Sequence, residues 1–169
     1  MAPNTSGNTH RMTDLRVVRK WHTDPVLLDA VRGLFTYGPN DDRATGIIYG
    51  EGRSWPEEFA AIGPLLLADL KQELGIDYEI VAFQAYRDGA GCGWHTDSPF
   101  DAQAVLSLGV TRSFGVRQGD DEPQIVQLEH GDLVIMPSGF QKEWQHCVPI
   151  EEEVTGERCS LVFRTVLRG

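Results

Sequence analysis

The segment IVAFQAYRDGAGCGWHTD, residues 80–97, carries the strongest structural signal in the chain. It begins with a mostly apolar run, 80–86, which has the length and composition of a β-strand. Asp88 and the glycines after it indicate a turn. The segment ends in His95-Thr96-Asp97, and because neighbouring strand residues face opposite sides, His95 and Asp97 are predicted to point to the same side. An imidazole and a carboxylate are therefore expected to converge at the end of a β-type segment.

Further short strand-type runs follow residue 97. They are separated by turn signals at residues 119–121, 130–132 and 137–139. Many short strands joined by turns of this kind are typical of an antiparallel sandwich or jelly roll. Together with 80–86, the predicted strands are 104–110, 113–116, 124–128, 132–136 and 159–166.

Two helical stretches precede this β-rich part. The first has apolar residues at helical spacing over 26–34. The second has capping-box spacing at Ser54 and Glu57, is expected to break and restart at residues 63–64, and ends at Gly75. We therefore predict an α+β fold that is mainly β, a jelly roll with N-terminal helices packed on one sheet.

The length of 169 residues suits one domain, which we assign to residues 14–169. Residues 1–13 are rich in Asn, Thr, Ser and Gly and lack the apolar stretch of a secretion signal, so we expect a flexible tail there. No apolar run approaches the roughly 20 residues that cross a bilayer, so no membrane association is expected. Three cysteines without paired spacing fit a reducing compartment, and we expect a cytoplasmic monomer.

The formal net charge of -10 argues against broad, non-specific adhesion to nucleic acid, because such binding depends on many phosphate contacts by Lys and Arg. A local basic rim remains compatible with this balance. Arg16, Arg19 and Lys20 are candidates for such a rim, although a solvated charged face is the favoured interpretation of this cluster.

His146 is a candidate third ligand from a distant part of the chain, because it lies between a strand-type run and the turn at residues 148–149. Two histidines and one carboxylate on one face of a metal leave three coordination positions open, which is the arrangement of non-haem Fe(II) oxygenases. A zinc site built on Cys92 and His95 is less favoured, because structural zinc needs four protein ligands and no second pair is evident. The sequence therefore predicts an Fe(II) site on His95, Asp97 and His146, which are also the catalytic residues.

The three open positions explain how such an iron works with a 2-oxo acid and O2 as co-substrates: the acid occupies two positions and O2 the third. The protein must then supply a cation for the far carboxylate of the acid. Arg158 is the best candidate, because a guanidinium pairs with a carboxylate through two hydrogen bonds and keeps its charge. Strand alternation places Ser160, Val162 and Arg164 on the same face as Arg158.

The order and spacing of these motifs resemble the AlkB-like family of Fe(II)- and 2-oxoglutarate-dependent dioxygenases, over roughly residues 55–168. The resemblance implies a double-stranded β-helix with iron on the three predicted ligands. The matching motifs are FQAYRDG (83–89), GWHTD (93–97), LSLG (106–109), HGDL (130–133), WQHCVP (144–149) and RCSLVFR (158–164).

The resemblance also implies the residues that contact 2-oxoglutarate. Arg158 would take the distal carboxylate with help from the Tyr86 hydroxyl, and Arg164 would lie near the iron-bound end. Gln84 and Ser160 complete the set, Ser160 standing where relatives often carry Asn. These five residues are the cofactor-binding candidates.

Members of the family typically oxidise N-methyl groups on nucleic-acid bases and release formaldehyde, so the resemblance implies an alkylated nucleic acid or nucleotide as substrate. Relatives build a substrate lid where this chain has residues 45–55, which include Tyr49, Arg53 and Trp55. After Asp97 the chain departs from many relatives, because Ser98-Pro99-Phe100 replaces acidic residues that can contact the base.

Two tryptophans next to metal ligands, Trp94 and Trp144, either stack on the substrate or fill the core, and packing is favoured for each. The substrate candidates are therefore Tyr49, Arg53, Trp55, Trp94 and Pro99. Two other functions stay open: a hydroxylase of a small molecule or peptide, favoured by the acidic balance and Pro99, and a cupin-like binder without turnover, which the presence of Arg158 beside an intact triad disfavours.

Overall fold

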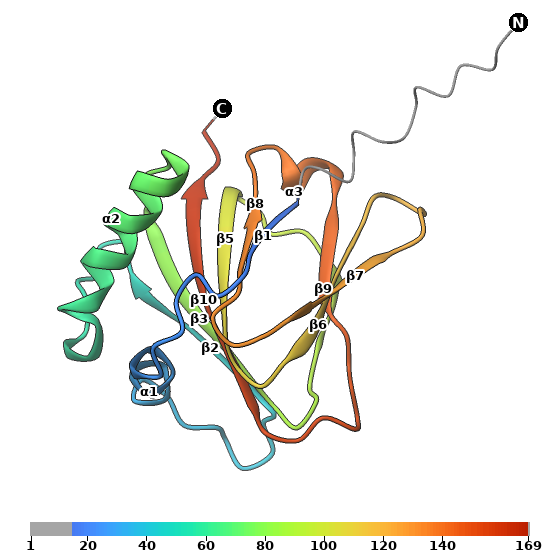
Figure 1. Ribbon diagram of the computed structural model, residues 1–169, viewed down its shortest axis with the longest axis horizontal. Coiled ribbons are helices and arrows are strands. Elements are labelled where there is room, and N and C mark those ends of the chain that lie inside the picture. Colours follow the sequence, from blue (N-terminus) through green and yellow to red (C-terminus); the bar gives the residue numbers. More distant parts are fainter. Residues whose placement is uncertain (1–14, 169) are drawn as a thin grey trace, which may run out of the picture.

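A computed structural model describes residues 15–168 and shows two antiparallel sheets that face each other, with helices on the outer side of the larger one. The larger sheet has six strands in the order β1-β8-β5-β10-β3-β2, and the smaller has four in the order β4-β9-β6-β7. In Figure 1 helices α1 and α2 lie to the left of the larger sheet, and the smaller sheet lies to the right. The strands are β1 Arg16–Val18, β2 Arg43–Tyr49, β3 Ile80–Arg87, β4 Cys92–His95, β5 Phe100–Gly109, β6 Arg112–Arg117, β7 Gln124–Leu128, β8 Leu133–Met136, β9 Gln145–Val148 and β10 Glu157–Val166.

The predicted jelly roll with buttressing helices is confirmed. The apolar runs predicted as strands from residue 80 onward correspond to β3, β5, β6, β7, β8 and β10, with ends that shift by a few residues. Four strands were not predicted: β1, β2, β4 and β9. Each of these is three or four residues long or, as in β2, interrupted by Thr and Gly, so none shows a clear apolar pattern.

The helices are α1 Val26–Arg32, α2 Ile62–Leu74 and the short α3 Phe140–Glu143, with a 3-10 turn over Glu57–Phe59. The prediction for the start of the second helix was wrong: Ser54 makes no cap hydrogen bond to the turn at residue 57, and α2 carries Gly63 and the following proline inside its first turn. A Cβ on Gly63 would come within 2.4 Å of the Trp55 ring, so glycine is needed there for packing. The predicted stop at Gly75 is confirmed, since this residue adopts the left-handed conformation (φ 71°).

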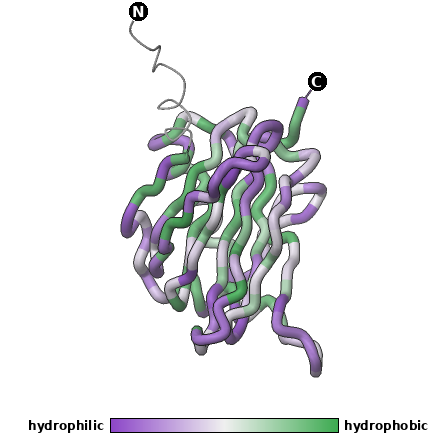
Figure 2. The backbone as a smooth tube through the Cα atoms, turned by 90° about the vertical axis from the view of Figure 1, so that its right-hand side faces the viewer, coloured by the Kyte–Doolittle hydropathy of each residue, from purple (hydrophilic) through white to green (hydrophobic). Residues whose placement is uncertain are grey.

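Two hydrophobic layers hold the sheets and helices together. One lies between the larger sheet and the helices and includes Leu66, Leu70, Phe83 and Phe163. The other lies between the two sheets and includes Val105 and Phe114. Figure 2 shows hydrophobic stretches along the strands and hydrophilic stretches in many of the loops that connect them. The polar groups described below therefore sit within an otherwise apolar layer between the sheets.

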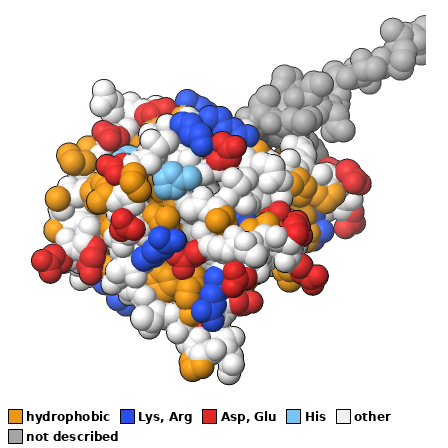
Figure 3. All heavy atoms as spheres, turned by 60° about the horizontal axis from the view of Figure 1, so that its bottom comes forward, with side chains coloured by type: hydrophobic (Ala, Val, Ile, Leu, Met, Phe, Trp, Pro, Cys, Tyr) orange, Lys and Arg blue, Asp and Glu red, His pale blue; other side chains and the backbone are white. Residues whose placement is uncertain are grey.

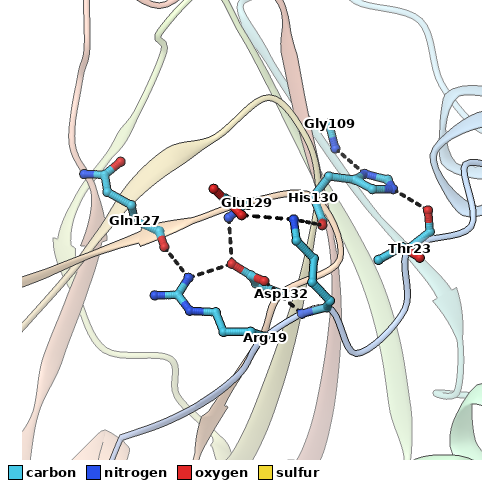
Figure 4. Close-up of polar contacts among 8 residues, drawn as sticks. Arg19, Thr23, Gly109, Gln127, Glu129, His130 and Asp132 are labelled. Atoms are coloured by element: carbon cyan, nitrogen blue, oxygen red, sulfur yellow. Dashed lines mark hydrogen bonds and ion pairs between the residues drawn. The ribbon is translucent and has the colours of Figure 1, made fainter.

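Asp132 explains the basic cluster near the start of the chain. Its carboxylate is fully buried and accepts hydrogen bonds from Arg19 Nη1 (2.6 Å), the backbone nitrogen of Lys20 (3.0 Å) and that of Glu129 (2.8 Å). Beside it, His130 accepts from the Gly109 backbone through Nδ1, as Figure 4 shows. A buried carboxylate needs such partners, so this cluster joins the β1 region to the turn before β8. Arg19 is thus engaged in an ion pair with a buried carboxylate, whereas the Lys20 ammonium pairs with Glu129 at the exposed surface.

The expected tail over residues 1–13 lies outside the described residues, and the assignment of one domain to 14–169 stays a prediction. Within residues 15–168, no helix has the length and apolar character that a transmembrane span requires.

Candidate active site

The three predicted metal ligands meet between the sheets. Strands β4 and β9 pair so that His95 lies directly opposite His146, and their ring centroids are 4.3 Å apart. Asp97 Oδ1 lies 3.4 Å from His95 Nε2, and Asp97 Oδ2 lies 3.2 Å from His146 Nε2. One potential ligand atom from each residue falls within 4.8 Å of the others, which is the size of a single metal site.

Asp97 reaches this cluster by a different route from the one predicted. Strand β4 ends at His95, so Asp97 lies in the following loop and does not share a strand face with it. Two glutamines hold it in place: the Asp97 backbone nitrogen donates to Gln141 Oε1 (2.9 Å), and Gln103 Nε2 donates to Asp97 Oδ2 (3.0 Å). The convergence of the two ligands was correctly predicted, but its cause is tertiary.

The donor set fits a ferrous ion. His95 Nδ1 lies 2.7 Å from the carbonyl oxygen of Gly93, and a proton held on Nδ1 by this contact leaves the Nε2 lone pair free for a metal. Burial by itself raises the pKa of Asp97, but the neighbouring His146 and His95 side chains hold that pKa well below its ordinary range. Asp97 is therefore anionic at neutral pH, and two imidazole nitrogens with one carboxylate form the ligand set expected for non-haem iron.

A narrow cavity opens beside the three ligands. It lies in the layer between the sheets, and its lining combines the metal ligands with residues from β3, β5 and β10. All but one of the predicted 2-oxoglutarate contacts line it; the exception is Ser160. The lining residues are Gln84, Tyr86, His95, Asp97, Gln103, Val105, Phe114, His146, Val148, Arg158, Val162 and Arg164.

Arg158 is the most unusual group in this lining. It is only 2% exposed, and its one hydrogen bond to a described side chain runs from Nε to Ser107 Oγ (3.0 Å). No carboxylate of residues 15–168 lies within ion-pair distance of it, and burial lowers the pKa of its guanidinium. A buried charge is costly unless it is paired, so this guanidinium is built to receive an anion inside the cavity.

The other predicted co-substrate residues surround Arg158. The Tyr86 ring lies 5.8 Å from the Arg158 guanidinium carbon, and its hydroxyl donates to Gln84 Oε1 (2.9 Å). Ser160 is fully buried on the same strand, and its Oγ has no hydrogen-bond partner among the described residues. Arg164 Nε donates to Gln103 Oε1 (2.9 Å), which brings its guanidinium toward the Asp97 end of the cavity.

The predicted substrate residues are not brought together. The rings of Tyr49 and Trp55 stack on each other (centroids 4.2 Å apart) and pack against the layer under the helices. Arg53 closes a small turn with Gly50. Trp94 lies under the Arg117 guanidinium (4.4 Å) beside an apolar groove that also includes Ile125 and Ile150.

None of these residues, nor Pro99, belongs to the lining of the cavity among the described residues. Pro99 follows a cis peptide bond, and its carbonyl accepts from the Leu167 backbone nitrogen (2.8 Å). Trp144 is buried and stacks on Phe140, which agrees with the favoured packing interpretation. A role for the five candidates in substrate binding stays a prediction.

Three polar residues of the site were missed from the sequence: Gln103, Ser107 and Gln141. A signal for the first two is present, because both are polar residues in an otherwise apolar strand and their spacing of four places them on one face. Gln141 has no comparable signal, since it lies on the one-turn helix α3 and reaches Asp97 only through the fold.

Comparison with known proteins agrees with this geometry. A model of the 2OG-Fe(II) oxygenase superfamily matches residues 7–164. The chain is 26% identical to the mouse protein named DNA oxidative demethylase ALKBH2 over 174 residues, which cover 94% of this chain and 69% of the relative. It is 32% identical to the rat protein named alpha-ketoglutarate-dependent dioxygenase alkB homolog 3 over 117 residues, which cover 60% of this chain and only 40% of the relative.

Solved structures share the fold at low identity. OsALKBH1 superposes with a TM-score of 0.63 at 20% identity and covers 90% of this chain and 98% of its own. A Pseudomonas putida prolyl-4-hydroxylase superposes with a TM-score of 0.61 at 20% identity, covering 92% and 94% of the two chains. Together with the match over nearly the whole sequence and the His-Asp-His cluster, these likenesses show that the chain belongs to the 2OG-Fe(II) oxygenase superfamily, among its AlkB-like members.

Proposed function

We propose that the protein is an Fe(II)- and 2-oxoglutarate-dependent dioxygenase that oxidatively demethylates alkylated nucleic-acid bases or nucleotides. The observation that carries the proposal is Arg158, a buried guanidinium without a carboxylate partner among residues 15–168, in the same cavity as the three metal ligands. A set of three metal-ligand side chains is by itself compatible with many functions. A set of metal ligands that shares a cavity with a buried guanidinium lacking a carboxylate partner among residues 15–168 fits an anionic co-substrate.

Iron, 2-oxoglutarate and O2 together supply the chemistry: the oxo acid loses CO2 and becomes succinate with one oxygen atom, while the other oxygen hydroxylates a substrate C–H bond. An N-hydroxymethyl product then releases formaldehyde and leaves an N–H group. The proton on the departing hydroxyl goes to the ring nitrogen, directly or through water, so no further oxidant is needed.

The residues of this chain bind and orient. His95, Asp97 and His146 would hold the metal through three positions and leave the others open. Arg158 would pair with the distal carboxylate, for which its planar fork of N–H groups is matched. Val105 and Val162 in the lining keep this part of the cavity apolar, which strengthens the ion pair by limiting contact with water.

Two variants separate these roles. Asp97→Ala removes the anionic ligand and is expected to abolish metal binding and turnover. Arg158→Ala leaves the metal ligands intact and is expected to raise the Kd for 2-oxoglutarate by roughly 30-fold or more, since a lost partner of a buried charge pair costs about 2–5 kcal/mol. Anaerobic titration of Fe(II) and then 2-oxoglutarate, followed by the visible charge-transfer band of the chelate, measures both. Equal loss of iron affinity in the two variants would contradict this division.

Formaldehyde and succinate release identify the substrate class. We expect both products in equal amounts with oligonucleotides or nucleosides that carry N-methylated bases, and succinate alone without a substrate. If no methylated nucleic acid or nucleoside raises turnover above that uncoupled level, the demethylase proposal fails while the dioxygenase proposal stands.

One observation favours a second candidate, a hydroxylase of a small molecule or peptide. Strand β6 pairs Val116 with His146, so the turn that follows β6 begins at the metal end of the smaller sheet. This turn carries Asp120, Asp121 and Glu122, all exposed, and such a cluster repels a nucleic-acid backbone. On the face drawn in Figure 3, basic side chains also lie among acidic ones. A free nucleoside or another small substrate would avoid this repulsion.

Location and assembly remain predictions from the sequence. The described cysteines, Cys92, Cys147 and Cys159, are all free thiols, which fits the expected cytoplasmic location. A monomer is expected, and its mass in solution is the test.

A further inference from the structure

Gln103 lies between the metal site and the second arginine of the cavity. It is fully buried on β5, opposite Arg164 of the neighbouring strand β10. Its Nε2 donates to Asp97 Oδ2 at 3.0 Å, and its Oε1 accepts from Arg164 Nε at 2.9 Å. The Gln103 side chain therefore connects Asp97, in the loop after β4 of the smaller sheet, to Arg164 on the larger sheet.

The chemistry of the two neighbours fixes the orientation of the Gln103 amide. A carboxylate only accepts hydrogen bonds and a guanidinium only donates them, whereas a carboxamide has a donor end and an acceptor end. Exchanging the amide nitrogen and oxygen would place donor against donor at Arg164 and acceptor against acceptor at Asp97. The assignment of the two atoms thus follows from the partners, and the bridge has one orientation.

The bridge also distinguishes the two oxygens of Asp97. Oδ2 accepts a hydrogen bond from Gln103 in addition to its contact with His146 Nε2 (3.2 Å), while Oδ1 faces His95 Nε2 without a second hydrogen bond among the described residues. A carboxylate with one oxygen engaged in this way favours binding a metal through the other alone. Single-oxygen binding matters, because a carboxylate that takes two positions would leave too few for a chelating oxo acid and O2.

We propose that Gln103 is a positioning residue that sets both the coordination mode of Asp97 and the place of the Arg164 guanidinium. Both ends of its amide are engaged by these two residues, through which it would act. The proposal rests on the proposed iron and 2-oxoglutarate binding, and it adds that the two binding events share one buried side chain.

The test compares the wild type with Gln103→Met, which keeps the length and lack of branching of the side chain and removes both hydrogen bonds. Fe(II) affinity and 2-oxoglutarate Kd are measured without oxygen, so that no turnover is needed. We expect each to weaken by about 10- to 100-fold, the usual range for residues that orient metal ligands. The chelate band is expected to shift, because the coordination mode of Asp97 changes; a purely structural residue would leave its position unaltered.

A second comparison isolates the route through Arg164. In an Arg164→Ala background, Gln103→Met is expected to have no further effect on 2-oxoglutarate Kd but to keep its effect on iron affinity. An effect on 2-oxoglutarate that is undiminished in that background would overturn the assigned role of Arg164 in the bridge.

Thr165→Val is the matched control. Its hydroxyl accepts from the Ala102 backbone nitrogen (2.9 Å) and donates to the Ala102 carbonyl oxygen (3.5 Å), so the variant removes side-chain hydrogen bonds between the same two strands, next to Gln103. Both affinities are expected to stay within twofold of the wild type. If Gln103→Met does not fold, Gln103→Asn loses the same contacts, because it is one methylene shorter, and the same shifts are expected.

The outcomes distinguish failure of the proposed function from failure of the role proposed for Gln103. Wild-type protein that binds neither iron nor 2-oxoglutarate would end the proposed function and the role of Gln103 together. Wild-type protein that binds both, with folded Gln103 variants whose affinities are unchanged, would overturn the role of Gln103 alone.

Discussion

Arg112 and Arg158 are both almost fully buried, at 1% and 2% exposure, yet their surroundings differ in kind. Arg112 donates from Nε to Glu151 Oε1 (3.0 Å) and from Nη2 to the carbonyl oxygens of Gly89 (3.1 Å) and Pro149 (2.7 Å). Within the described residues, the one hydrogen bond of Arg158 goes to the neutral hydroxyl of Ser107. The fold provides the Arg112 guanidinium with a carboxylate and two carbonyl partners, whereas the Arg158 guanidinium can pair with an anionic ligand.

The difference gives a way to distinguish structural from functional charge in this molecule. Arg112 and the Asp132 cluster each tie loops to strands through complete sets of partners. Arg158 lines the cavity without a carboxylate partner among residues 15–168, and Ser160 Oγ on the same strand is buried without a hydrogen-bond partner among them. A buried charge that the fold leaves unpaired marks where an anion can bind.

The largest effect is expected from Arg112→Met. Removing this guanidinium leaves the Glu151 carboxylate and two carbonyl groups without their partner, and breaking a buried pair in this way costs about 3–5 kcal/mol. Chemical denaturation of the metal-free protein measures the free energy of unfolding. A loss below about 1 kcal/mol would show that the Arg112 network is not structural.

Arg158→Met should behave in the opposite way. Because no ion pair is broken, we expect the free energy of unfolding without ligand to fall by no more than about 1 kcal/mol. The variant should instead lose stabilisation by ligand: 2-oxoglutarate at about 100 times its Kd adds about 2.7 kcal/mol to the metal-loaded wild type, and the same concentration should add little to the variant. Equal stabilisation of both proteins would remove Arg158 from the binding site.

The smallest effect concerns acid. Burial alone raises the pKa of Glu151, but hydrogen bonds from the Ser113 backbone and Arg112 outweigh it and lower that pKa in the folded protein. A carboxyl group with a lowered folded-state pKa stabilises the fold in full above its ordinary value of 4.5, and that contribution disappears as the pH falls through the lowered value. Glu151→Gln should therefore weaken the dependence of unfolding free energy on pH in this acidic range. An unchanged slope would mean that the Arg112 pair does not depend on the charge of Glu151.

Elements of the fold that depend on local sequence were predicted, whereas short strands that depend on contacts between distant residues were not. The long apolar strands and the stop at Gly75 depend on local pattern and spacing, so these were predicted correctly. Short strands such as β4 and β9 form by pairing between distant segments, as where His95 lies opposite His146, and no local pattern of four residues indicates such pairing.

The partners of the site residues were equally hidden. Arg158 was identified by its chemistry, but its lack of a carboxylate depends on what the fold places around it. The aromatic residues Tyr49 and Trp55 were assigned to a substrate lid, whereas their rings stack on each other against the layer under the helices. The sequence shows which residues have suitable side-chain chemistry. Which other groups each side chain contacts depends on how the chain packs.

The two sheets carry different halves of the site: His95 and His146 belong to the smaller sheet, and Arg158 and Arg164 belong to the larger. The distance from the metal ligands to the arginines is thus set by the thickness of the hydrophobic layer between the sheets. Val105 and Phe114 belong to this layer, and both line the cavity. A change of one methylene group at Val105 or Phe114 is therefore expected to alter how the metal and the co-substrate are aligned while every polar residue of the site stays the same.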